Sequence, residues 1–347
     1  MNKKELGKLL KEKQRRTRLK SYEQDFTKFA EEQIQIVTKD VSQGFVPFTF
    51  NEAQRIITEK LEKQKNETGK VRAIVLKARQ QGISTYCAGR VFWKSYYTPY
   101  ARSVVMAHDS ATSDALFSMS KNLIRNMEGD LAPSELRSNA KEIIINSPAM
   151  ADKDATASYR LYTAGSPEAG RGTTPTIAHC SEVAFWQHDE KILAGLFQGI
   201  SSADGTEVIL ESTANGAQGE FYRLWKGAEN GENEYIPIFL PWYITTEYTR
   251  DPPDNMELTI DEEKLQDKYS LTEGQLYWRR LKIAEGGELK FKQEYPSSPD
   301  EAFIMSGSNV FNLERLDSLV PQSYQRRSEW DILSKMFDEN REGSLYT

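Results

Sequence analysis

Short runs of apolar residues alternate with stretches of helical periodicity between about residues 71 and 243. Several of these runs are continuously apolar, which is typical of strands that are buried on both faces of a sheet. The alternation predicts an α/β fold, in which a mostly parallel sheet is flanked by helices. The expected strands are residues 73–76, 103–107, 143–145, 159–163, 176–178, 208–211 and 236–240.

The pattern changes on both sides of this central region. Residues 1 to about 45 are polar with apolar residues at helical spacing, so we expect helices there. Asn51 is a good N-cap for a further helix, and residues 63–70 are expected to form a polar linker into the first strand. Beyond residue 244 we expect one charged helix over residues 261–284, bounded by glycine and proline breaks.

Composition limits the class of protein. The 347 residues carry 45 basic and 51 acidic side chains, a net charge of −6, which argues against general coating of nucleic acid. Residues 1–20 nevertheless contain nine Lys or Arg and two Glu, either a solvated helix or a nucleic-acid contact. No run of eighteen apolar residues exists, and the two cysteines lack metal-type spacing. We therefore expect a protein of a reducing, cytoplasmic setting with no membrane span.

The loop after the first strand has the strand–loop–helix setting of the phosphate-binding motif G-x-x-x-x-G-K-[ST]. Gly82 and Ser84 match its second glycine and its hydroxyl, whereas Ile83 replaces the lysine. Backbone N–H groups would bind phosphate there, Ser84 would reach Mg²⁺, and Lys77 or Arg79 would have to supply the missing charge. The loop by itself fits nucleotide binding and a polar turn without a ligand equally well.

Two later strand ends carry groups that suit ATP hydrolysis. Glu182 follows a short apolar strand, where a carboxylate can orient and polarise the attacking water, or can simply be solvated. Ser181 precedes it and could hold a metal-bound water, but it brings no charge. Ser212, Thr213 and Asn215 follow another apolar strand, and their hydroxyl and amide groups could hydrogen-bond a γ-phosphate or its water.

In this order, residues 77–85, 181–186 and 212–216 resemble the deviant P-loop (Walker A), the acidic Walker B segment and the coupling motif of one family. That family is the large terminase subunit of tailed bacteriophages, and the resemblance is to its ATPase domain. Residues 50–54 resemble its adenine-reading segment, and residues 293–303 resemble the run that leaves the domain. The resemblance implies a P-loop NTPase core of the ASCE/RecA-like class with a small helical lid.

The resemblance also implies roles for particular residues. The ATP-binding residues would be Gln54, Lys77, Ala78, Arg79, Gln80, Gln81, Gly82, Ile83, Ser84 and Thr85. Glu182 would be the catalytic carboxylate, with Arg79 on the γ-phosphate, and Arg171 would act in trans unless it is only a glycine-flanked surface arginine. Ser84 and Ser181 would lie at Mg²⁺, while Ser212, Thr213 and Asn215 would couple phosphate release to movement.

The implied function is an ATP-hydrolysing motor that drives double-stranded viral DNA into a procapsid in the host cytoplasm. Its cofactors would be ATP and Mg²⁺. Its partners would be the portal protein, the small terminase subunit and further copies in a ring, pentameric on the portal. Two alternatives stay open: a helicase-like DNA-dependent ATPase, and a nucleotide-binding assembly module without turnover, which Ile83 and Ser181 suggest.

The expected organisation follows the same resemblance. Residues 1–60 would form an N-terminal helical segment with the adenine-side helix, and residues 61–245 the ATPase core. Residues 246–310 would form the lid, and residues 311–347 a linker. Because the family's nuclease domain would begin where this chain ends, we expect a motor domain without nuclease activity.

Overall fold

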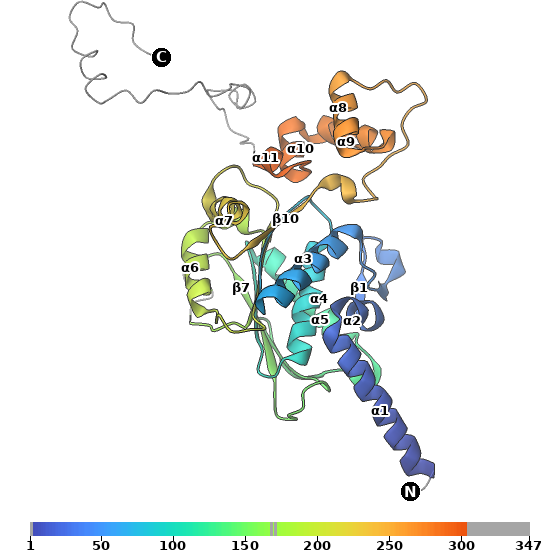
Figure 1. The fold of residues 1–347 in the computed structure, drawn as a ribbon, viewed down its shortest axis with the longest axis vertical. Coiled ribbons are helices and arrows are strands. Elements are labelled where there is room, and N and C mark those ends of the chain that lie inside the picture. The colour runs from blue at the N-terminus through green and yellow to red at the C-terminus, as the bar shows by residue number, and fades with distance from the viewer. Residues whose placement is uncertain (1–2, 167–168, 170–171, 304–347) are drawn as a thin grey trace, which may run out of the picture. The chain divides into compact units, whose positions relative to one another are not determined.

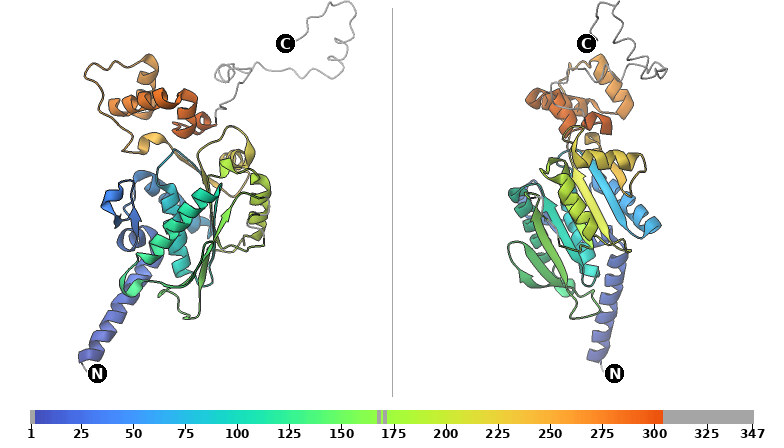
Figure 2. Two further views of the ribbon diagram at one scale, coloured as in Figure 1. Left: turned by 180° about the vertical axis from the view of Figure 1, so that it is seen from behind. Right: turned by 90° about the vertical axis from the view of Figure 1, so that its left-hand side faces the viewer.

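The structure is a computed structural model, and it describes residues 3–166, 169 and 172–303, all within one unit. Within these ranges the main element is an eight-stranded sheet with the order β10-β3-β9-β8-β4-β7-β6-β5. The parallel strands are β3 (Val71–Lys77), β4 (Arg102–Ala107), β7 (Ala157–Thr163), β8 (Ile177–Ser181), β9 (Glu207–Ser212) and β10 (Ile236–Leu240). Figure 2 shows these strands side by side in its right-hand view.

All seven strands expected from the apolar runs are present, so the mostly parallel α/β fold is confirmed. β6 (Glu142–Asn146) is one of them and pairs antiparallel with β7. Within this sheet only β5 (Ser134–Ser138), which pairs antiparallel with β6, was not expected from the sequence. Four of its five residues are exposed, so it has no apolar run to mark it.

Helices cover both faces of the sheet (Figure 1). On one face lie α3 (Glu52–Thr68), α4 (Ile83–Tyr97) and α5 (Ser110–Arg125), and on the other lie α6 (Asp189–Gly199) and α7 (Gly219–Glu229). β3 shows why a continuously apolar strand is required between them. Its Ala73 and Val75 belong to the hydrophobic cluster on the α3–α5 side, whereas Ile74 and Leu76 belong to the cluster on the α6–α7 side.

The N-terminal part departs from the expected run of helices. α1 (Lys3–Gln24) and α2 (Phe26–Gln33) are followed by a small hairpin of β1 (Gln35–Val37) and β2 (Phe45–Pro47), with the 3₁₀ turn η1 (Val41–Gln43) between them. The expected linker over residues 63–70 was also wrong, because α3 continues to Thr68. Leu61 and Gln64 are buried on its inner face, and Gly69 ends it in the left-handed conformation.

The start of α3 is as expected. The Asn51 side chain accepts a hydrogen bond from the backbone N–H of Gln54, and the Gln54 side chain accepts one from the backbone N–H of Asn51. This reciprocal capping box satisfies two N–H groups that would otherwise lack partners. It also fixes the position of Gln54, which matters for the loop described below.

The region after β10 contains four short helices rather than one long stretch. They are α8 (Ile260–Tyr269), α9 (Glu273–Gly286), α10 (Glu288–Glu294) and α11 (Pro299–Ala302), preceded by the 3₁₀ turn η4 (Trp242–Ile244). The expected single helix was wrong because Ser270 adopts φ of 54° and ends α8, after which Thr272 caps α9. Stacked and edge-on aromatic rings, among them Trp242, Tyr248 and Trp278, give this region its own core.

No helix within the described ranges is long and apolar enough to cross a bilayer.

Candidate functional site

The three segments singled out in the sequence meet at one edge of the sheet. In the parallel register Leu76 of β3 lies opposite Ser212 of β9, and Ser181 of β8 lies opposite Glu211 of β9. The carboxyl ends of β3, β9 and β8 are therefore neighbours. Ligands of open α/β sheets bind at this end of the strands.

The loop between β3 and α4 is held in place by side chains from α3. Gln54 Nε2 donates to the carbonyl oxygen of Gly82 at 2.8 Å, and Asn51 Nδ2 donates to that of Gln81 at 3.0 Å. Within the loop, the Gln81 side chain accepts from the backbone N–H of Ala78 at 3.1 Å. These bonds leave the N-terminus of α4 with a fixed backbone, the geometry that anion binding requires.

The left-handed backbone of Gly82 yields a first prediction. Gly82→Ala is expected to lower the free energy of unfolding by roughly 1–2 kcal/mol. The residue has φ of +72°, and an added Cβ would lie 2.8 Å from Gln54 Nε2. Urea denaturation measures the change. Gly7→Ala is the matched control, because an added Cβ there meets nothing within 4 Å, and equal losses in both variants would contradict the prediction.

A buried ion cluster lies beneath the loop. Lys77 Nζ is 2.9 Å from Glu182 Oε1 and 3.2 Å from Glu211 Oε2, and only 7% of the Lys77 side chain is exposed. Glu211 Oε1 in turn accepts a hydrogen bond from Ser84 Oγ at 3.0 Å, and His179 Nε2 lies 3.3 Å from the same oxygen. The cluster thus joins β3, β8, β9 and the first turn of α4.

Both partners of the buried ion pair are held in their charged forms. Burial lowers the pKa of Lys77, but the charges of Glu211 and Glu182 outweigh this and raise the pKa overall. Burial raises the pKa of Glu211, but Lys77 and then His179 outweigh it, and the pKa of Glu211 is lowered. Two carboxylates and one ammonium group therefore share this space as ions.

Glu182 has an unusual backbone and connects to the segment after β9. Its φ of 54° places a residue other than glycine in the left-handed region, directly before the 3₁₀ turn η3 (Val183–Phe185). Ser212 Oγ and the Thr213 backbone N–H each donate to Glu182 Oε2 at 3.4 Å. Asn215 Nδ2 donates to the carbonyl oxygen of Ala184 at 3.0 Å. The residues proposed for coupling thus hold the Glu182 turn directly.

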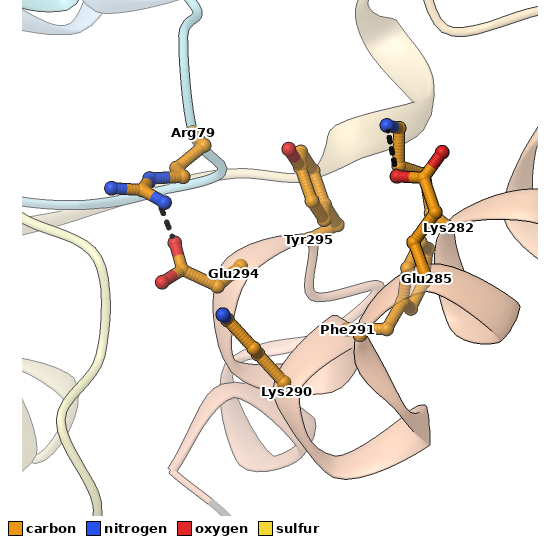
Figure 3. A pocket seen from close by; sticks show the side chains of 8 residues that line it. Arg79, Lys282, Glu285, Lys290, Phe291, Glu294 and Tyr295 are labelled. Carbon is orange, nitrogen blue, oxygen red and sulfur yellow. Dashed lines mark hydrogen bonds and ion pairs between the residues drawn. The ribbon is translucent and has the colours of Figure 1, made fainter.

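Arg79 lies on the outer side of the loop and is 57% exposed. Its Nε is 3.1 Å from Glu294 Oε2, and its backbone N–H donates to the carbonyl oxygen of Glu294. A pocket of about 250 Å³ opens beside this pair, and Lys282 and Lys290 also line it. Figure 3 shows the Arg79 guanidinium turned toward the Glu294 carboxylate at this pocket.

The remaining sequence candidates have other surroundings. Ala78 and Ile83 are buried in two different hydrophobic clusters, Gln80 is exposed and Thr85 is half-buried. Ser181 is buried, and its carbonyl oxygen accepts a hydrogen bond from Trp186 Nε1. Arg171 lies outside the described residues.

Sequence reasoning missed Glu211, His179 and Glu294. Glu211 had a detectable signal, because it is an acidic residue at the end of an otherwise apolar strand, Val208-Ile209-Leu210. Acidic residues are almost never fully buried unless they are paired. His179 and Glu294 had no comparable signal, since their partners come from other segments.

The donor set under the loop suits a hard cation. Mg²⁺ is usually bound by one or two carboxylates together with water and substrate phosphates. No group of three or more His, Cys, Asp or Glu side chains suited to a metal ion occurs among residues 3–166, 169 and 172–303. Ser84 and Glu211 offer a hydroxyl and a carboxylate oxygen 3.0 Å apart. A Mg²⁺ ion that brings phosphate and water ligands fits these residues, whereas an ion needing a complete protein cage does not.

No family model and no curated protein matches the sequence. Among solved structures, the large terminase of bacteriophage HK97 matches with a TM-score of 0.52 and 12% identity, over 78% of this chain and 53% of that one. The large terminase ATPase domain of Thermus phage P74-26 matches with 0.47 and 16%, over 75% and 97%. The large terminase of another thermophilic bacteriophage, in complex with ADP, matches with 0.48 and 12%, over 74% and 54%. The chain therefore shares the fold of the HK97 large terminase and spans about half its length.

Proposed function

We propose that this chain is the ATP-hydrolysing motor domain of a viral terminase large subunit, which drives double-stranded DNA into a procapsid. The observation that carries the proposal is the meeting of Ser84, Lys77 and Glu182 at the carboxyl ends of neighbouring parallel strands. A hydroxyl, a cation and a carboxylate at the end of a phosphate-type loop are the groups that ATP hydrolysis uses. The fold shared with the HK97 large terminase supports the motor family.

The proposed nucleotide site occupies the loop from Lys77 to Thr85. Backbone N–H groups at the start of α4 bind the phosphates, and Gln54 lies beside the loop on the side proposed for adenine. Bound Mg²⁺ would neutralise charge on the β- and γ-phosphates, with Ser84 and Ser181 as the residues proposed to hold it. Glu182 is proposed to orient the attacking water.

Both cations proposed for the phosphates are paired with carboxylates in the structure. Lys77 faces Glu182 and Glu211, and Arg79 faces Glu294 of α10. Nucleotide phosphates would replace these carboxylates as partners of the cations. Because Glu294 belongs to the proposed lid, release of Arg79 provides a direct link between nucleotide binding and lid position.

The segment after β9 is proposed to transmit the state of the phosphate. Ser212 and Thr213 both contact the Glu182 carboxylate, and Asn215 holds the turn that follows it. On the other side, Gln293 Nε2 donates to the carbonyl oxygen of Ala214 at 2.8 Å. The segment therefore touches both the catalytic carboxylate and the proposed lid, as coupling requires.

The partners belong to the same proposal. They are double-stranded viral DNA, the portal protein, the small terminase subunit and further copies in a pentameric ring, with Arg171 acting across subunits. The protein would act in the host cytoplasm and transiently on the procapsid. The proposed parts are the N-terminal segment of residues 1–60, the core of 61–245, the lid of 246–310 and the linker of 311–347.

The proposal predicts slow hydrolysis by the isolated protein. Phosphate release from ATP should require Mg²⁺ and stop in EDTA, and a duplex with a single-stranded overhang should stay paired during turnover. Colorimetric phosphate release and a fluorescent unwinding assay measure the two properties. Nucleotide binding without phosphate release would instead support the assembly module, and strand separation would support the helicase-like ATPase.

A further inference from the structure

The end of β8 lacks an acidic residue where the motor chemistry calls for one. Ser181 stands directly before Glu182, and its neutral hydroxyl brings no charge to a cation. In the parallel register, the residue opposite Ser181 on the neighbouring strand is Glu211. An acidic residue is therefore present at the same level of the sheet, one strand closer to β3, the strand that carries the loop.

The contacts of Glu211 are directed toward the loop. Its Oε1 accepts the hydrogen bond from Ser84 Oγ at 3.0 Å, and Ser84 is the hydroxyl proposed to bind Mg²⁺. Its Oε2 accepts no hydrogen bond from the described residues and faces Lys77 Nζ at 3.2 Å. The side chain itself is fully buried. Removing a carboxylate from water at this depth is costly unless it is paired, so its position is well determined.

A role as counter-ion for Lys77 does not account for this arrangement. Lys77 already has Glu182 as a partner, at the shorter distance of 2.9 Å. One ammonium group and two carboxylates leave one negative charge uncompensated in the cluster. A second cation would balance that charge, and the hydrogen bond from Ser84 marks the side on which such a cation would lie.

We propose that Glu211 is the acidic group of the Mg²⁺–nucleotide site and takes the part that Ser181 leaves unfilled. The inference rests on the proposed function, because it needs nucleotide to bind at the loop. Glu211 acts through Ser84, as a positioning residue that orients the hydroxyl and supplies negative charge beside the ion. Residues in this position beside a metal ligand affect metal affinity nearly as strongly as the ligands do.

The test measures metal-linked binding rather than turnover. Isothermal titration of ADP into the full chain, in Mg²⁺ and in EDTA, gives the factor by which the metal tightens binding. Electron paramagnetic resonance of Mn²⁺ with the ADP complex reports metal binding directly. In Glu211→Gln we expect metal affinity to fall by about 10- to 100-fold, with ADP affinity in EDTA unchanged.

Two further variants separate the metal role from the counter-ion role. Glu182→Gln removes the other partner of Lys77 and should keep the metal-linked gain. Ser181→Asp in the Glu211→Gln background returns a carboxylate to the opposite strand and should recover most of it. Equal losses in Glu182→Gln and Glu211→Gln, or no recovery in the double variant, would overturn the proposal.

Folding is checked by circular dichroism and thermal unfolding. If Glu211→Gln does not fold, the double variant carries the test, and failure of both to fold would give Glu211 a structural role and overturn the proposal. Wild-type protein that binds no ADP would remove the proposed function and this inference together. Wild-type protein with metal-linked binding that Glu211→Gln retains would remove this inference alone.

Discussion

Glu182→Gln is expected to abolish measurable ATP hydrolysis while nucleotide binding persists. Positioned acid–base groups contribute about 10²- to 10⁴-fold to rate, and the slow turnover expected of the isolated protein leaves little after such a loss. The amide has the same shape but cannot accept a proton from water. Lys77 keeps Glu211 at 3.2 Å, so the variant does not leave a buried charge alone. Phosphate release and ADP titration measure the two properties separately.

The matched control for this variant is Glu190→Gln. Glu190 is exposed on α6 and undergoes the same loss of charge outside the site, so its hydrolysis should equal that of the wild type. Hydrolysis that survives in Glu182→Gln would remove Glu182 from its proposed role. Loss of both binding and hydrolysis there would assign the carboxylate to holding Lys77 in place.

The second large effect concerns stability. Arg90→Met is expected to lower the free energy of unfolding by about 3–5 kcal/mol, because it leaves a buried carboxylate without its main partner. Arg90 Nε is 2.7 Å from Glu207 Oε2, and the two side chains are 1% and 2% exposed. Burial lowers the pKa of Arg90, but Glu207 outweighs it and raises the pKa, so the arginine is charged. Denaturant unfolding followed by circular dichroism measures the loss.

Two variants distinguish the ion pair from lost packing. Arg90→Met combined with Glu207→Met removes both charges and should recover most of the loss, since apolar replacements of buried ion pairs are often neutral. Arg55→Met on the exposed face of α3 should change stability by no more than about 0.5 kcal/mol. A double variant as unstable as Arg90→Met would show that the volume of the arginine matters more than its charge.

Local pattern was sufficient wherever one segment determines its own structure. The seven apolar runs became strands, and Asn51 caps α3, because burial on both faces and a nearby backbone N–H are encoded within a few residues. The same local reasoning failed at residues 35–47, where the hairpin has no strong alternation, and at residues 270–272. At the latter, a serine in the left-handed conformation divides a stretch whose composition is helical throughout.

The candidate site divides along the same line. The sequence by itself determined the succession of strands along the chain, the phosphate-type loop and the positions of Ser84 and Glu182 at strand and helix ends. Only the tertiary structure decided that Glu211, 127 residues from Ser84 along the chain, meets it at 3.0 Å. It also decided that Arg79 faces Glu294. The physical reason is that parallel register and helix packing bring distant segments together, and no local pattern encodes which strand lies beside which.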